Sequence, residues 1–172
     1  MELTSVEQAR YPILQELHTA GVRYAFFEHP PVFTVEEGLE LLAHIPGQGT
    51  KNLFVTDKKK HRLGLVTVCE EKRVDLKQLG EQIGFGRLSF GSADRLRQCL
   101  GVEPGSVSPL AMLFHGAQHV DCFVDADLFA AEQIQIHPLR NTATILVAPH
   151  ELFHQFFSSR GIAAQQIQIP CL

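Results

Sequence analysis

Several segments of the chain carry apolar residues at helical spacing behind a residue that can cap a helix. Thr4 with Glu7, and Thr34 with Glu37, form two capping boxes. In such a box the threonine hydroxyl and the glutamate carboxylate each accept a hydrogen bond from a backbone N–H of the first turn. Periodicity and caps together predict helices. The predicted helices cover residues 4–20, 34–46, 75–83 and 92–100, and a last one begins at Pro149.

Other segments have the length and composition of β-strands. The clearest are two apolar runs, Thr50–Asp57 and Leu63–Cys69, which a charged turn separates, and this pattern predicts a hairpin. Helices and strands mix without strict βαβ alternation, which indicates an α/β fold around a mixed sheet. No repeat or linker interrupts the chain, so we expect one domain over residues 1–172. The other predicted strands cover residues 23–28, 120–124, 133–136, 142–147 and 167–169.

Composition is that of an ordinary globular protein. Of the 172 residues, 45% are hydrophobic and 20% are charged. No apolar run approaches the roughly 20 residues that cross a bilayer, so we expect no membrane partner. The N-terminus lacks the pattern of a signal peptide, and the 4 cysteines form no CxxC pair. We therefore expect a cytoplasmic protein with reduced thiols.

Charge is distributed unevenly. The net charge is −4, yet residues 51–97 carry eleven Lys and Arg against six acidic residues, while the flanking segments 1–50 and 98–172 are both acidic. A localised basic surface is the electrostatic footprint of a protein that binds a phosphate backbone. The alternative is a solvated charged surface with no partner.

One segment matches the H-E-x-x-H pattern of zinc hydrolases. His150 and His154 would lie one turn apart on a helix, with Glu151 placed as a general base. No His, Asp or Glu follows His154, however, so the segment offers no third ligand nearby. We interpret it as a surface helix and expect no metal, and a zinc hydrolase stays open as an alternative function.

The sequence offers no serine nucleophile in a G-x-S-x-G setting. Other groups in the sequence could bind or polarise a substrate. Lys51 stands at the entrance of a predicted strand, where it can hold an anion, although a strand-end lysine can also simply extend into water. The loop from Gly105 to Pro109 can turn backbone groups toward a ligand. His137 and Asn141 lie at a strand end, where functional side chains often collect.

Four stretches together resemble a known family. They are His29–Glu37, Thr50–Phe54, Gly105–Pro109 and His137–Thr142. In this order and spacing they resemble the YbaK/prolyl-tRNA-synthetase editing-domain family, and most of all its free-standing ProX-type branch, which clears alanine from proline tRNA. The resemblance extends from about residue 5 to 170.

The resemblance implies an α/β domain with a mixed, partly barrel-like sheet, and hydrolysis of the ester between a wrong amino acid and the 3′ end of tRNA. Lys51 matches the lysine that holds the terminal nucleotide, and Gly105 opens the loop that frames the aminoacyl group. Thr34 and Val35 begin a helix that closes over that group. The other residues expected to contact substrate are Asn52, Ser106, Val107, Ser108, Pro109, His137 and Asn141.

The resemblance implies no cofactor. The expected partner is aminoacyl-tRNA, through the acceptor end of tRNA(Pro), with transient contacts to prolyl-tRNA synthetase or an elongation factor. Ala-tRNA(Pro) is the expected substrate, because a synthetase pocket sized for proline gains only about 1–3 kcal/mol of discrimination per missing methylene. Cys-tRNA(Pro) and a non-catalytic nucleic-acid-binding module are the alternatives.

Overall fold

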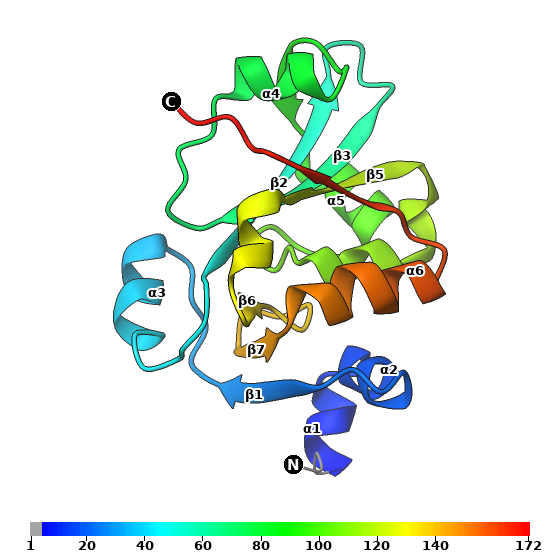
Figure 1. The fold of residues 1–172 in the computed structure, drawn as a ribbon. Coiled ribbons are helices and arrows are strands. Elements are labelled where there is room, and N and C mark those ends of the chain that lie inside the picture. The colour runs from blue at the N-terminus through cyan, green and yellow to red at the C-terminus, as the bar shows by residue number, and fades with distance from the viewer. Residues whose placement is uncertain (1–4) are drawn as a thin grey trace.

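The computed structural model describes residues 5–172, which form a mixed α/β fold with two β-sheets (Figure 1). This confirms the predicted fold class. The resemblance implied one partly barrel-like sheet. The structure has two sheets instead, and neither closes on itself. The capping residue Thr4 lies outside the described residues.

The larger sheet is built on the predicted hairpin. Strand β2 (Thr50–Asp57) pairs with β3 (Leu63–Cys69) in antiparallel register, with Thr50 opposite Cys69 and Thr56 opposite Leu63. All of β3 is buried, so the hairpin forms the centre of the sheet. The strand order is β4-β2-β3-β5-β8, completed by β4 (Leu88–Phe90), β5 (Val120–Asp125) and β8 (Ala164–Ile167).

The smaller sheet is antiparallel and has the order β1-β7-β6. Its strands are β1 (Tyr24–Glu28), β7 (Ala143–Val147) and β6 (Ile134–Ile136). The two sheets meet just before β2, where the backbone of Gln48 exchanges hydrogen bonds with that of residues 133 and 135. The entrance of β2 is therefore fixed by both sheets.

The helices confirm the predicted caps at Thr34, Asp75 and Ser92, and they correct two predictions. The helix predicted over residues 34–46 ends at Leu41. Thr34 and Glu37 form the second capping box at the start of α3. The predicted helix over residues 4–20 is wrong as a single helix, because Pro12 removes a backbone donor and the helix breaks there. The bounds are α1 (Ser5–Arg10), α2 (Ile13–Thr19), α3 (Val35–Leu41), α4 (Leu76–Gln82), α5 (Ala93–Leu100) and α6 (Phe157–Ser159).

Short helices of other types fill the connections. The segment after Pro149 begins as a π-helix, η4 (His150–Phe156), which continues into α6. The 3₁₀-helices are η1 (Pro109–Leu113), η2 (His115–His119) and η3 (Ala126–Ala130). The last strand is β8, which ends at Ile167, so the strand predicted at 167–169 starts earlier and ends sooner.

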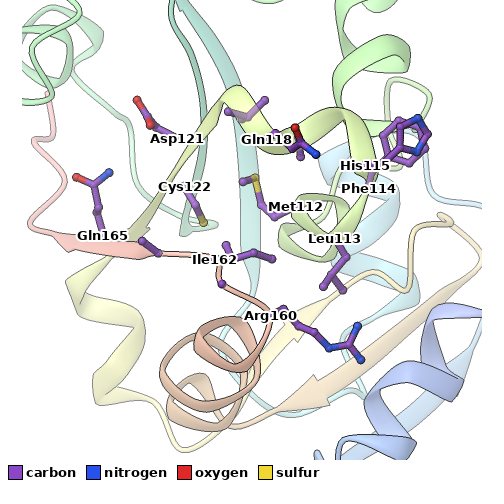
Figure 2. Close-up of a pocket in the computed structure, with 14 residues that line it drawn as sticks. Met112, Leu113, Phe114, His115, Gln118, Asp121, Cys122, Arg160, Ile162 and Gln165 are labelled. Carbon is purple, nitrogen blue, oxygen red and sulfur yellow. The ribbon is translucent and has the colours of Figure 1, made fainter.

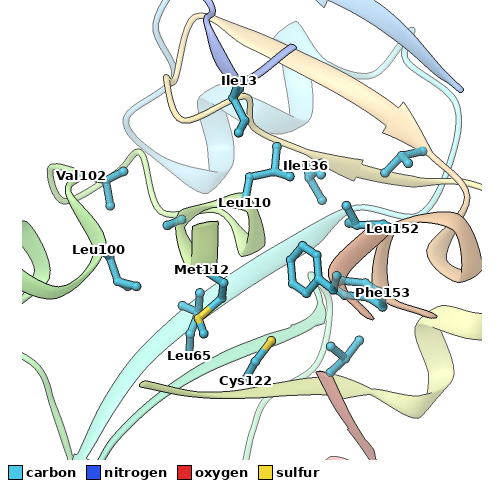
Figure 3. Close-up of a cluster of buried hydrophobic side chains, with 14 of the residues drawn as sticks. Ile13, Leu65, Leu100, Val102, Leu110, Met112, Cys122, Ile136, Leu152 and Phe153 are labelled. Atoms are coloured by element: carbon cyan, nitrogen blue, oxygen red, sulfur yellow. The ribbon is translucent and has the colours of Figure 1, made fainter. Parts of the chain in front are cut away.

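Two apolar clusters hold these layers together. The larger lies between the two sheets and is completed by α2, α5 and η4 (Figure 3). Leu65, Leu110 and Phe153 belong to it, each nearly or fully inaccessible to water. The smaller cluster covers the other face of the hairpin, where Val55 and Val66 pack against Leu79 of α4. Burial on both faces makes the hairpin a rigid support for residues at its ends. Among the described residues no helix is long and apolar enough to cross a membrane.

Candidate functional site

A cavity of about 310 Å³ lies at the entrance of β2, beside the junction of the two sheets. Its wall is formed by β2, the segment before α3, the loop that follows α5 and the end of β6. The structure therefore brings together segments that are far apart in the sequence. The predicted site residues that line this cavity are Thr34, Lys51, Asn52, Gly105, Val107 and His137.

Lys51 is half-buried, and its ammonium donates a hydrogen bond to the backbone carbonyl of Lys72. A carbonyl orients the ammonium but does not neutralise its charge. No carboxylate of the described residues forms an ion pair with Lys51. The cavity thus contains a positioned cation whose charge is available to an anionic ligand.

The neighbouring lysine has a different function. Lys72 forms ion pairs with the buried Asp125 at 2.9 Å and with Asp127 at 2.6 Å. Burial lowers the pKa of Lys72, but the hydrogen bonds and charges of the two aspartates outweigh burial and raise that pKa above its ordinary value. Lys72 is therefore a structural cation, and its fixed backbone carbonyl gives Lys51 a stable acceptor.

Asn52 connects the hairpin to the loop across the cavity. Its amide nitrogen donates to the Val107 carbonyl at 3.1 Å, and its amide oxygen accepts from the Thr67 hydroxyl at 2.7 Å. These two bonds fix the orientation of the amide, because an amide turned the other way would place oxygen against oxygen at Val107. Asn52 thus holds the loop while its side chain forms part of the wall.

The loop begins with a turn that only certain residues adopt. Ser106 N–H donates to the Glu103 carbonyl at 3.1 Å, and Gly105 has φ of +90°. With Pro104 before Gly105, this is the pattern of a type II turn, which needs a positive φ at its third position. A Cβ on Gly105 would meet no atom within 4 Å, so the backbone conformation, rather than lack of space, requires glycine.

The remaining predicted loop residues do not line the cavity. Ser108 is fully buried, and its hydroxyl accepts from Leu110 N–H at 3.3 Å to cap η1. Pro109 is the buried first residue of that helix. Ser106 is half-buried beside them. In the structure Ser108 and Pro109 anchor the loop, and Gly105 and Val107 face the cavity.

Two histidines stand close to the wall. His137 Nδ1 lies 3.3 Å from the Ala143 carbonyl, and because a carbonyl only accepts, Nδ1 carries the proton and neutral Nε2 keeps a lone pair. Burial lowers the pKa of His137, and the nearby His29 lowers it further. The hydrogen bond to Ala143 raises that pKa and so offsets part of the decrease. His29 bridges the Pro30 carbonyl and the Thr144 hydroxyl, each at 2.9 Å. A neutral imidazole at the cavity can therefore accept a proton.

The segment that leads into α3 also lines the cavity. Asn141 is not part of the wall; its amide donates to the Val32 carbonyl at 3.3 Å and holds the chain that leads into α3. Phe33 follows at the rim and is 77% exposed. Val35 is the first residue of α3, and its side chain is not among those the structure describes.

Sequence reasoning missed Glu70, which also lines the cavity. Its N–H donates to the Gly49 carbonyl at 2.9 Å, which continues the hairpin register by one pair. A Cβ on Gly49 would collide with the Glu70 carboxylate, so glycine there leaves room for that side chain. The hairpin register, once counted from the turn, places Glu70 beside the cavity and was the available signal.

A larger cavity of about 450 Å³ lies elsewhere, between the η1–η2 segment, β5 and the chain after α6 (Figure 2). Its charged groups are already paired within the protein: Arg160 with Glu16 at 2.8 Å, and Asp121 with Arg62 at 3.6 Å. Burial raises the pKa of the Cys122 thiol to about 12, so it is not a nucleophile near neutral pH. None of the predicted site residues lines this cavity.

The two histidines of the H-E-x-x-H segment lie on the exposed side of η4, whereas Leu152 and Phe153 between them are buried. The His150 and His154 rings are 4.9 Å apart between centroids and both pack against Phe129. Glu151 is bound by Arg23, which lowers the pKa of that carboxyl through hydrogen bonds. Within the described residues no cluster of three His, Cys, Asp or Glu side chains is placed to hold a metal ion.

Comparison with known proteins identifies the family. The model of the aminoacyl-tRNA editing domain matches residues 29–154, which contain the whole cavity. The chain belongs to this family. Its members are hydrolases of mischarged aminoacyl-tRNA. The family assignment confirms the resemblance that the four sequence motifs indicated.

Individual relatives support the same family assignment. Prolyl-tRNA synthetase associated domain-containing protein 1 of Xenopus laevis is 36% identical over 156 residues, covering 88% of this chain and 92% of its own. Prolyl-tRNA editing protein ProX of Acetoanaerobium sticklandii is 32% identical over 144 residues, covering 84% and 88%. A solved structure described as a candidate trans-editing enzyme for prolyl tRNA synthetase has a TM-score of 0.68 at 22% identity, covering 98% and 99%, and supports the fold.

Proposed function

We propose that this chain, as one editing domain over residues 1–172, is a trans-acting deacylase that hydrolyses mischarged tRNA(Pro), with Ala-tRNA(Pro) as its main substrate. The observation that carries the proposal is that the Lys51 ammonium, which forms no ion pair, shares a cavity with Gly105 and Val107 of the loop. The names of the relatives support tRNA(Pro) as the tRNA.

In this proposal Lys51 anchors the 3′-terminal nucleotide through its phosphate or ribose. The charge is not neutralised within the protein, and the half-buried position strengthens its attraction to an anion. Because β2 is held by both sheets, the anchored nucleotide would be fixed relative to the loop. Positioning of this kind supplies much of the rate for an ester that is already activated.

The loop would polarise the ester carbonyl. Within the described residues no backbone carbonyl accepts from the N–H of Gly105 or of Val107, so both groups remain available at the cavity. Fixed N–H donors stabilise the negative charge that develops on a carbonyl oxygen under attack. The Asn52 bond to the Val107 carbonyl would keep these donors in place.

Water would be the nucleophile. Its oxygen bonds to the carbonyl carbon and one of its protons passes to His137 Nε2, while the neighbouring ribose hydroxyl can orient the attacking water by a hydrogen bond. The bond from that carbon to the ribose oxygen then breaks, and the ribose oxygen takes up a proton. The products are the free amino acid and tRNA with an intact 3′ end. This route needs neither a serine nucleophile nor a cofactor.

The preference for alanine follows from size. A pocket that accepts proline cannot strongly reject the smaller alanine, whereas a second, smaller pocket admits alanine and rejects proline by steric clash. A free-standing enzyme must meet the mischarged tRNA in the cytoplasm after its release, through transient contact with prolyl-tRNA synthetase or an elongation factor. Co-purification of the synthetase or the elongation factor with this chain in the presence of Ala-tRNA(Pro) tests the proposed contact.

A deacylation panel tests the proposal. Alanyl-, cysteinyl-, seryl- and prolyl-tRNA(Pro) are each incubated with the purified chain, and the release of amino acid is followed over time. The proposal expects the fastest turnover with alanyl-tRNA(Pro) and none with prolyl-tRNA(Pro). Fastest turnover with cysteinyl-tRNA(Pro) would replace the substrate assignment. Salt-dependent binding without any turnover would identify a binding module instead.

A further inference from the structure

The cations of the basic segment 51–97 fall into two groups. Those of the first group form ion pairs with carboxylates of the same chain: Arg97 pairs with Asp94 at 2.9 Å and with Glu103 at 2.8 Å, while Lys72 and Arg62 have the partners already described. Others have no ion-pair partner among the described carboxylates. Five of the unpaired cations come together at the turn of the β2–β3 hairpin, namely Lys58, Lys59, Lys60, Arg87 and Arg95.

Local structure explains why these five meet. Lys58–Lys60 form the turn itself, and Arg95 donates a hydrogen bond to the Lys60 carbonyl at 3.3 Å. Arg87 directly precedes β4, whose Leu88 is opposite Asp57. The Asp57 carboxylate is occupied by the N–H groups of residues 61 and 62, which lower its pKa. The nearest acid therefore caps the turn instead of pairing with the lysines.

An exposed aromatic ring and a cavity lie beside these cations. Phe90 is 62% exposed, one of the few large apolar side chains at the surface of the described residues. A cavity of about 310 Å³ beside it is lined by Thr56, Lys60, Leu63, Phe90, Gly91, Ser92 and Arg95. We call Lys58, Lys59, Lys60, Arg87, Phe90 and Arg95 the tip surface. Cations around an exposed aromatic ring form the arrangement that binds unpaired nucleotides.

The tip surface is joined to the catalytic cavity by one continuous edge of the sheet. From Lys51 to Asp57 the strand advances six residues, about 20 Å at roughly 3.3 Å per residue. Along that edge Gly91 N–H donates to the Phe54 carbonyl at 2.9 Å, and Asn52 binds Val107. Helix α5 leads from Ser92 at the tip to the loop that contains Gly105.

We propose that the tip surface binds the phosphate backbone of the substrate tRNA a few nucleotides before its 3′ end, with Phe90 stacking on an unpaired base. This inference rests on the proposed function, because the 3′-terminal adenosine must occupy the cavity at Lys51. Phosphate contacts position a nucleic acid without reading its sequence. The tip surface would therefore set affinity and orientation, and the cavity would perform the chemistry.

Binding of uncharged tRNA(Pro) tests the surface directly. The variant Lys59→Ala/Arg95→Ala is compared with the matched control Arg10→Ala/Arg23→Ala. Both remove two positive charges, and the control residues lie on α1 and just before β1, at the other end of the molecule (Figure 1). We expect a several-fold higher Kd for the tip variant only, with the slope of log K against log salt reduced by about one per cation removed. Equal Kd values and slopes for the two variants would overturn the inference.

Deacylation kinetics separate this inference from the proposed function. The substrates are alanyl-tRNA(Pro) and 3′-O-alanyl-adenosine, which can occupy the cavity but has no phosphate or second base to reach the tip. The tip variant should have a several-fold lower kcat/KM on alanyl-tRNA(Pro) and an unchanged kcat/KM on alanyl-adenosine. A tip variant equal to wild type on both substrates contradicts the inference alone. A wild-type chain that hydrolyses neither contradicts the proposed function.

Phe90 is tested by two substitutions. Phe90→Leu keeps an apolar side chain, whereas Phe90→Tyr keeps the aromatic face. Stacking predicts several-fold weaker tRNA(Pro) binding for Phe90→Leu and near wild-type binding for Phe90→Tyr. Equal binding by both variants would remove the stacking part of the inference.

Discussion

The side-chain amide of Asn52 donates a hydrogen bond to the Val107 carbonyl at 3.1 Å and so ties the strand that carries Lys51 to the loop across the cavity. The bond joins residues that are 55 positions apart in the chain. It fixes the distance between the cation and the backbone donors on which the proposed reaction depends.

Replacement of Asn52 by aspartate tests that bond. A carboxylate cannot donate to the Val107 carbonyl, so two acceptors would face each other and the loop would lose its anchor. We expect deacylation to fall by about 5-fold to 150-fold, which corresponds to the roughly 1–3 kcal/mol cost of an unsatisfied polar group. The measurement is kcat/KM on alanyl-tRNA(Pro), with Thr67→Val as the control that removes only the other bond to Asn52. Wild-type kcat/KM in Asn52→Asp would show that the loop needs no such anchor.

Gly105→Ala should impair catalysis through the backbone. An L-residue at φ of +90° costs about 1–2 kcal/mol, and the type II turn should relax and move the N–H donors. Gly21→Ala is a matched control, because Gly21 has φ of +76°, has equally open surroundings and lies far from the cavity. Both variants should lose similar thermal stability, but only Gly105→Ala should lose activity. Equal activity in the two variants would exclude a catalytic function for the turn.

The pH dependence should reflect the lowered pKa of His137. Because burial favours the neutral imidazole, Nε2 stays able to accept a proton below the ordinary value of 6.5. We expect the acid limb of kcat for alanyl-tRNA(Pro) to lie below pH 6.5 and to disappear in His137→Asn. A limb at or above pH 6.5, or one unchanged in His137→Asn, contradicts the proton-acceptor function.

The same shift affects folding. The unfolded chain binds a proton at His137 more readily than the folded chain, so the free energy of unfolding should decrease as the pH falls from about 6.5 toward the lowered folded pKa. Chemical unfolding of wild type and His137→Asn across this range measures the difference.

Local rules were sufficient for much of the fold. The hairpin followed from two apolar runs around a charged turn, and the caps at Thr34, Asp75 and Ser92 followed from side chains that bind the N–H groups of a first turn. Pro12 was the local signal that the first helix prediction overlooked. Strand β4 is only three residues long, and its pairing with β2 depends on contacts that periodicity cannot reveal.

Part of the candidate site could also be predicted from local rules. Lys51, Gly105 and His137 stood out as residue types at strand ends and turns. Asn141 and Ser108 also stood out, but their polar atoms hold the Val32 segment and the start of η1, which only the tertiary structure reveals. Glu70 was missed because it follows a strand by one residue and faces the cavity only through the hairpin register.

The central claim is that Lys51 anchors the end of the substrate, and single-turnover hydrolysis of alanyl-tRNA(Pro) by Lys51→Ala tests it most directly. Lys77→Ala, at an exposed lysine on α4, is the control, and circular dichroism confirms that both variants fold. The account predicts that Lys51→Ala loses nearly all deacylation and that Lys77→Ala stays within a few-fold of wild type. A folded Lys51→Ala variant with wild-type deacylation would contradict it.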